Sequence, residues 1–91
     1  MSYTVYRLTV EDYDKFRRNF FEEGGIALRQ AYGSRGGRLF RSSRDPQEII
    51  LLQEWDDLEN ARRLLQSKEL REQQQRAGVV GVETYEEVGH F

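Results

Sequence analysis

The side chains best suited to chemistry in this sequence lie on segments that are predicted to form strands. Its arginines could bind an anionic substrate, and a tyrosine could donate a hydrogen bond to that substrate. Because side chains alternate along a strand, we expect one group of these residues to share a face of a sheet. The group is Arg7, Gln53, Trp55 and Tyr85, joined by Arg41 or Arg38 according to register.

Each of these residues also has a structural interpretation. A large aromatic such as Trp55, at the end of a buried strand, is usually a packing anchor whose indole N–H finds one partner. An arginine such as Arg7 commonly pairs across strands with an acid such as Glu83 or Glu54. Tyr85 is a poor base at neutral pH when its pKa is near 10 and no cation is close. The structural interpretation is favoured for Trp55, Arg7, Arg41 and Tyr85, so these residues alone do not establish an active site.

Other kinds of site are disfavoured. The chain has no cysteine, which excludes disulfides, thiolate catalysis and zinc fingers. His90 is the only histidine and has no second histidine as a partner, so we expect no metal site. Arginines recur at positions 35, 38, 41 and 44, but a spacing of three alternates faces on a strand and forms no continuous phosphate-binding row. With a net charge of −2, the chain is not expected to bind nucleic acid.

Length and composition predict one small folded domain spanning residues 1–91. Hydrophobic residues make up 37% of the chain and aromatic residues 12%, which is too apolar for a disordered segment. The longest apolar run, Ile49 to Leu52, is far too short to cross a membrane, and no N-terminal run resembles a signal peptide. We therefore expect a soluble cytoplasmic protein with no membrane partner.

The pattern of residues predicts four strands, because β-forming residues alternate at period two between turn signals. One such turn is made by Asp45-Pro46, between the second and third strands. The expected strands are Tyr3–Leu8, Arg38–Ser43, Glu48–Trp55 and Val79–Val88.

Two helical segments are predicted between these strands. The first begins in Thr9–Asp12, which has the S/T-x-x-acid form of a helix start, and Gly24-Gly25 should kink or break it. The second begins at Asp56-Asp57, is interrupted locally at Ser67 and ends at Gly78. The expected apolar stripe of the first segment is Tyr13, Phe16, Phe20, Ala27 and Ala31.

The order β-α-β-β-α-β is the ferredoxin-like arrangement, an α+β fold with a four-stranded antiparallel sheet and the helices packed on one face. In the third strand Ile49 and Leu51 point to one side while Ile50 and Leu52 point to the other, so both faces are apolar. The helices cover one face, and the economical cover for the other is a second copy of the sheet. We therefore expect a homodimer with a shared barrel-like interior.

Four segments carry a resemblance to a known family: residues 10–14 at the first helix start, residues 36–42, residues 48–52 running into 54–61, and residues 66–71 at the break in the second helix. Over nearly its whole length the chain resembles the dimeric α/β barrel superfamily, and within it the antibiotic biosynthesis monooxygenase-like proteins. These motifs are mostly architectural. Members of this family are similar in dimer architecture and differ in chemistry.

The resemblance implies a cofactor-independent monooxygenase that acts on a small reduced aromatic or quinol-like compound in a barrel cavity. It assigns binding and polarisation of the substrate to Arg7, Trp55 and Tyr85 as catalytic residues, with Arg41 and Gln53 binding substrate. No cofactor is expected on this interpretation.

Haem chemistry is disfavoured, because haem-degrading relatives use a histidine on the second helix where this chain has Leu64 and Leu65. The alternative function is a non-catalytic dimeric small-molecule-binding or interaction protein of the same fold, because no residue set in this chain can be explained only by catalysis.

Overall fold

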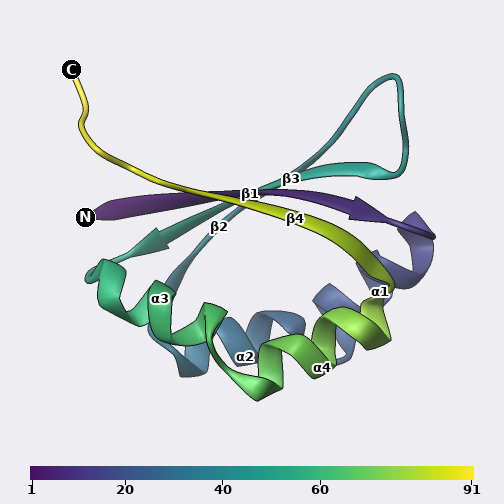
Figure 1. Ribbon diagram of the computed structural model, residues 1–91, viewed down its shortest axis with the longest axis horizontal. Coiled ribbons are helices and arrows are strands. Elements are labelled where there is room, and N and C mark those ends of the chain that lie inside the picture. Colours follow the sequence, from purple (N-terminus) through teal and green to yellow (C-terminus); the bar gives the residue numbers. More distant parts are fainter.

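A computed structural model describes all residues, 1–91, as a twisted antiparallel sheet with its helices packed on one side (Figure 1). The strand order is β2-β3-β1-β4, so the two central strands are the first and third along the chain. The ferredoxin-like arrangement predicted from the sequence is confirmed. The elements are β1 (Ser2–Val10), α1 (Tyr13–Glu22), α2 (Gly25–Ala31), β2 (Ser34–Arg41), β3 (Glu48–Trp55), α3 (Leu58–Leu65), α4 (Lys68–Ala77) and β4 (Val79–Glu86).

Both predicted helical segments are divided where the sequence indicated a break. Gly24 has φ +102°, and a Cβ on Gly25 would lie 2.6 Å from the Cα of Phe20, so both positions favour glycine. In the second segment the Ser67 hydroxyl accepts a hydrogen bond from the Leu70 amide at 3.1 Å and thereby caps α4. The two breaks separate α1 from α2 and α3 from α4.

The first helix begins later than predicted. Thr9 is part of β1, where it pairs with Glu48, and its hydroxyl donates to the Glu48 carboxylate at 2.9 Å. The residue that caps α1 is Asp12, whose side chain accepts from the amides of Asp14 and Lys15. The sheet therefore takes Thr9 and Val10, the first half of the apparent capping motif, because pairing with neighbouring strands satisfies their backbone groups.

The strand register decides which side chains face the helices. β1 and β3 are antiparallel and pair Thr4 with Gln53 and Arg7 with Ile50. Even positions of β1 therefore share a face with odd positions of β3, and this face is covered by the helices. β2 has an irregularity between Ser34 and Gly37, where the pairing register of β2 against β3 shifts.

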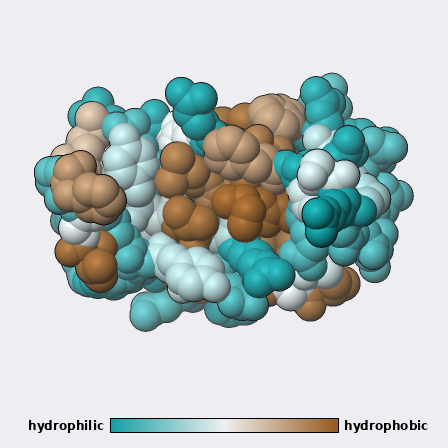
Figure 2. Space-filling model, turned by 90° about the horizontal axis from the view of Figure 1, so that it is seen from above, coloured by the Kyte–Doolittle hydropathy of each residue, from teal (hydrophilic) through white to brown (hydrophobic).

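The opposite face of the sheet carries an apolar surface that no helix covers, and Figure 2 shows it gathered over the middle of the molecule. On β3, Ile49 is fully buried under the helices while Ile50 is 37% exposed on this side. The prediction that β3 is apolar on both faces is confirmed. The apolar residues of this open face are Tyr3, Val5, Phe40, Ile50, Leu52 and Tyr85.

Candidate functional site

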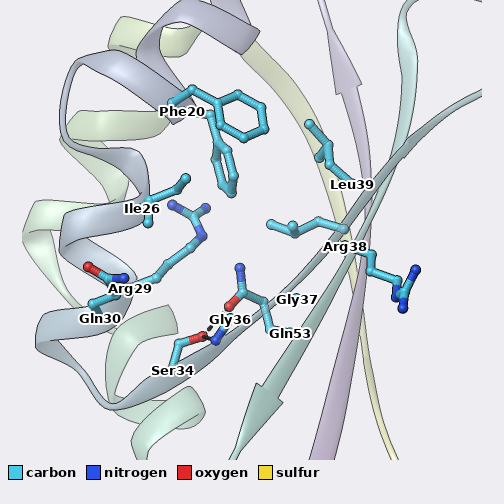
Figure 3. A pocket seen from close by; sticks show the side chains of 12 residues that line it. Phe20, Ile26, Arg29, Gln30, Ser34, Gly36, Gly37, Arg38, Leu39 and Gln53 are labelled. Atoms are coloured by element: carbon cyan, nitrogen blue, oxygen red, sulfur yellow. Dashed lines mark hydrogen bonds between the residues drawn. The ribbon is translucent and has the colours of Figure 1, made fainter.

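A partly open cavity of about 250 Å³ lies between the sheet and the first two helices (Figure 3). It opens beside the β2 irregularity, where Gly36 and Gly37 contribute no side chains to its wall. Its apolar wall comes from Phe20, Phe21, Ile26, Leu39 and Leu51. Its polar lining residues are Arg29, Gln30, Ser34, Arg38 and Gln53.

The most unusual group in this cavity is the guanidinium of Arg29, on α2, because the residue is only 8% exposed. Its Nη1 donates to the Gly25 carbonyl oxygen at 2.9 Å and to Oε1 of Gln73 at 3.0 Å. The guanidinium carbon also lies 4.8 Å from the centre of the Phe20 ring. Its Nε and Nη2 make no hydrogen bond to the protein and are not sealed from solvent.

No carboxylate neutralises this arginine, since none of the six ion pairs of the protein includes it. Burial lowers the pKa of Arg29 to about 10, so the side chain is still protonated at neutral pH. A buried cation without an acid is unusual because the loss of hydration is not repaid by an ion pair. Arg29 therefore gives the cavity a positive charge that is available to a ligand.

A short chain of buried amides holds the guanidinium in place. Gln73 of α4 accepts from Arg29 through Oε1 and donates through Nε2 to Oδ1 of Asn19, on α1, at 2.8 Å. Asn19 and Gln73 are 2% and 3% exposed. Because both amides are fixed by burial and by each other, they leave Arg29 little freedom to turn.

Gln53 supplies a second donor to the cavity. Its Oε1 accepts a hydrogen bond from the Ser34 hydroxyl, and Ser34 in turn accepts from the Gly36 amide at 3.2 Å. The Nε2 of Gln53 has no protein acceptor, and Figure 3 shows it pointing from β3 toward Arg29. The unused polar groups of Arg29 and Gln53 are thus all hydrogen-bond donors, which suits a ligand with acceptor oxygens.

Tyr6 lies on the inner side of Arg29. The two residues line a void of about 10 Å³, and the Tyr6 hydroxyl is buried without any hydrogen-bond partner. Burial raises the pKa of Tyr6, so its hydroxyl stays neutral at physiological pH and can act as a donor.

Among the residues predicted to form a site, Gln53 lines the cavity, while Trp55 lies outside it. Trp55 is fully buried and its Nε1 donates to the Thr4 hydroxyl at 2.9 Å. Arg41 faces the helices, with its guanidinium 4.3 Å from the centre of the Tyr13 ring. The arrangement of Trp55 matches its structural interpretation, whereas Arg41 forms no ion pair with an acid and packs on the Tyr13 ring instead.

Arg7 and Tyr85 lie on the open face instead. Arg7 pairs with Glu48 at 3.5 Å, and the Tyr85 hydroxyl donates to the Glu83 carboxylate at 2.7 Å. That hydrogen bond raises the pKa of Tyr85 and makes its hydroxyl a weaker acid.

The prediction that these residues share one face is therefore wrong for Arg7 and Tyr85, whereas Gln53, Trp55 and Arg41 do share the face toward the helices. Alternation links residues within a strand, but the register between strands pairs Arg7 with Ile50 and places Gln53 opposite Thr4. Arg7 and Tyr85 consequently project to the side of the sheet away from Gln53 and Trp55. Arg38 pairs with Leu52 and also faces away from the helices, and Figure 3 shows its side chain directed out of the cavity.

Arg29 was not singled out by the sequence pattern. The expected apolar stripe continued through Ala27 and Ala31, which are exposed. The break at Gly24-Gly25 restarts the helix in a different phase, so that Ile26 and Arg29 turn toward the sheet. The available signal was the spacing of three between Ile26 and Arg29 after a double glycine.

No protein-family model matches this sequence, and no curated protein matches it significantly. Solved structures do match in fold. SnoaB, a cofactor-independent oxygenase from Streptomyces nogalater, is 17% identical, with a TM-score of 0.79 over 99% of this chain and 93% of that one. An antibiotic biosynthesis monooxygenase is 14% identical, with a TM-score of 0.74 over 99% of both chains. The protein PA3566 from Pseudomonas aeruginosa is 13% identical, with a TM-score of 0.64 over 93% of this chain and 90% of that one.

None of the helices is long and apolar enough to span a membrane.

The fold matches extend over almost the entire chain at identities that establish architecture rather than activity. The resemblance to antibiotic biosynthesis monooxygenase-like proteins is confirmed at the level of fold: the chain has the ferredoxin-like fold of these proteins.

Proposed function

We propose that the protein is a cofactor-independent monooxygenase of small reduced aromatic or quinol-like compounds, and that the cavity beside α2 binds its substrate. The observation that carries this proposal is the protonated, 8% exposed Arg29, which has no carboxylate partner and directs free N–H groups toward an apolar cavity. The likeness in fold to a cofactor-independent oxygenase supports it.

The chemistry expected in such a cavity begins with an acidic C–H group beside an aromatic ketone. Water takes the proton, and the electron pair spreads onto the ketone oxygen as an enolate. A preorganised cation such as Arg29 stabilises the negative oxygen, which lowers the free energy of the anion.

The enolate carbon then transfers one electron to O₂, and the two radicals combine and take up a proton to form a hydroperoxide. Loss of water breaks the O–O bond and the remaining C–H bond and leaves a carbonyl group. One oxygen atom enters the product and the other leaves as water. The substrate supplies all four electrons, so the reaction needs no cofactor.

The same proposal includes a homodimer through the open face. Six apolar residues there have no cover from this chain, and a sheet from a second copy would bury them and supply the second wall of a barrel. Arg7 and Tyr85 would then line the interior between the two sheets, apart from the Arg29 cavity. Of the residues first assigned to the site, Gln53 keeps its proposed role as a substrate-binding residue.

A second candidate function is ligand binding without turnover. The side chains that line the cavity include no carboxylate and no histidine, so the protein offers no strong base for deprotonation. A protein of this kind would bind its ligand saturably and leave it unchanged.

Oxygen uptake distinguishes the two functions. Purified protein would be mixed with 1,8-dihydroxyanthrone, and uptake above spontaneous oxidation would be measured for wild type, Arg29→Gln and Arg18→Gln, an exposed arginine on α1 that serves as the matched control. We expect Arg29→Gln to lose about 10²–10³-fold in kcat/KM and Arg18→Gln to behave as wild type. With ¹⁸O₂, one labelled atom should enter each product molecule. No uptake above background with anthrones, naphthols or quinols would reject the oxygenase in favour of the binding protein.

A further inference from the structure

We infer that the cavity is selective for a planar aromatic anion that presents two coplanar oxygens, which Arg29 binds side-on through Nε and Nη2. This inference rests on the proposed function in placing the ligand in the same cavity. It adds the chemical class of the ligand and the edge of the guanidinium that recognises it.

The edge follows from which donors are already occupied. Nη1 makes both of its hydrogen bonds inside the protein, to Gly25 and Gln73. Three N–H groups remain, one on Nε and two on Nη2, and Nε–H points in parallel with one of the Nη2 N–H groups along one side of the guanidinium plane. Two parallel donors match two oxygens of one plane, as in a carboxylate or a ketone with a neighbouring ionised hydroxyl, and such bidentate pairs are stronger than single contacts.

The charge of the ligand follows from what the cavity lacks. Nε2 of Gln53 is a free donor beside Arg29, and no acid of this chain lies within ion-pair distance of the guanidinium. A neutral ligand would leave the buried cation uncompensated, whereas an anion would pair with it. The site therefore favours an anion over a neutral molecule of the same shape.

The shape of the ligand follows from the walls and the volume. A volume of about 250 Å³ lies just below the range of about 300–1,000 Å³ for pockets that hold drug-sized molecules. Phe20, Ile26, Leu39 and Leu51 supply apolar contacts around this space. A flat compound of two or three fused rings, with its oxygens at one edge, meets both constraints.

The test compares two probes of nearly equal shape, 2-naphthoate and the neutral 2-naphthamide, by isothermal titration calorimetry. Wild-type protein and Arg18→Gln should bind 2-naphthoate at least tenfold more tightly than 2-naphthamide, and Arg29→Gln should lose that preference. Arg29→Lys keeps the charge but not the parallel donors, so its preference should be intermediate. Equal binding of the two probes by wild type, or an undiminished preference in Arg29→Gln, would overturn the inference.

A second variant tests where 2-naphthoate binds without changing the charge of Arg29. Leu39→Trp should fill the cavity and abolish binding of 2-naphthoate while Arg29 stays intact, and binding that survives this substitution would place the ligand elsewhere. Oxygen uptake is measured separately. If 2-naphthoate binds as expected but no anthrone is oxidised, the proposed function fails and the inference stands. If 1,8-dihydroxyanthrone is oxidised while 2-naphthoate neither binds nor inhibits, the inference fails and the function stands.

Discussion

Replacing Arg29 by methionine should make the ligand-free protein more stable. Burial lowers the pKa of Arg29 to about 10, and at about 1.36 kcal/mol per pKa unit this costs the folded state about 3 kcal/mol at neutral pH. Methionine keeps much of the aliphatic volume and removes the charge. It leaves Oε1 of Gln73 without its donor, which costs about 1–2 kcal/mol.

The difference between these effects is a net stabilisation of about 1–2 kcal/mol for Arg29→Met. For a domain of this size, that corresponds to a rise in Tm of about 4–16 °C. The assay is thermal and urea unfolding of both proteins at one protein concentration, without added ligand. Arg35→Met is the control: its guanidinium is exposed and paired with Asp56, and the change should stay within about 0.5 kcal/mol.

The stabilisation should also depend on pH in a defined direction. The pKa of Arg29 is lower in the folded protein than in the unfolded chain, so above about pH 10 the unfolded state binds more protons than the folded state. Wild-type stability should therefore rise relative to Arg29→Met as the pH passes above 10, and the advantage of the variant should shrink. If Arg29→Met is instead less stable than wild type by more than about 1 kcal/mol at pH 7, the guanidinium stabilises the fold, and the reasoning that it is kept for a ligand is refuted.

Three further predictions concern the sheet. Gly37→Ala should destabilise the protein by at least about 2 kcal/mol, because its Cβ would lie 1.8 Å from a backbone oxygen of β3. Gly89→Ala is the control, since its Cβ would have no atom within 4 Å and the unfolding free energy should change little. Equal urea midpoints for the two variants would contradict the close packing at Gly37. Ile50→Asp should shift native mass spectra from dimer to monomer, because it places a charge in the proposed interface, and a wild-type monomer would reject that interface. Trp55→Phe should lower stability by about 1–3 kcal/mol, since it leaves the buried Thr4 hydroxyl without the indole donor. A Trp55 that acted only in substrate binding would leave the Tm unchanged and raise KM.

The order of elements was predictable from the sequence because its signals are local. The double glycine at 24–25 and the serine at position 67 mark the breaks in the two helical segments through backbone conformation and capping, which need no knowledge of distant residues. The two-sided apolar pattern of β3 likewise depends only on its own alternation.

The site was less predictable because it depends on relations between elements. Whether Arg7 and Gln53 share a face is decided by the pairing register of β1 with β3, which neither strand contains alone. Arg29 faces the cavity only because α2 begins in a new phase after the glycines. A charged residue in an amphipathic segment is ordinarily expected on the solvated side, so the pattern favoured the wrong side of α2.

The shortness of α2 has a consequence for the order in which parts of the molecule open. A helix of seven residues has little stability of its own, because an isolated helix generally needs about 12–15 residues to persist in water. Its position therefore depends on contacts made by side chains such as Arg29, which joins it to Gln73 of α4 and to the ring of Phe20. Local opening of α2 therefore requires less free energy than global unfolding. An anion that binds Arg29 raises the free energy of this local opening first. Amide hydrogen exchange should then slow in residues 25–31 before it changes in the central strands.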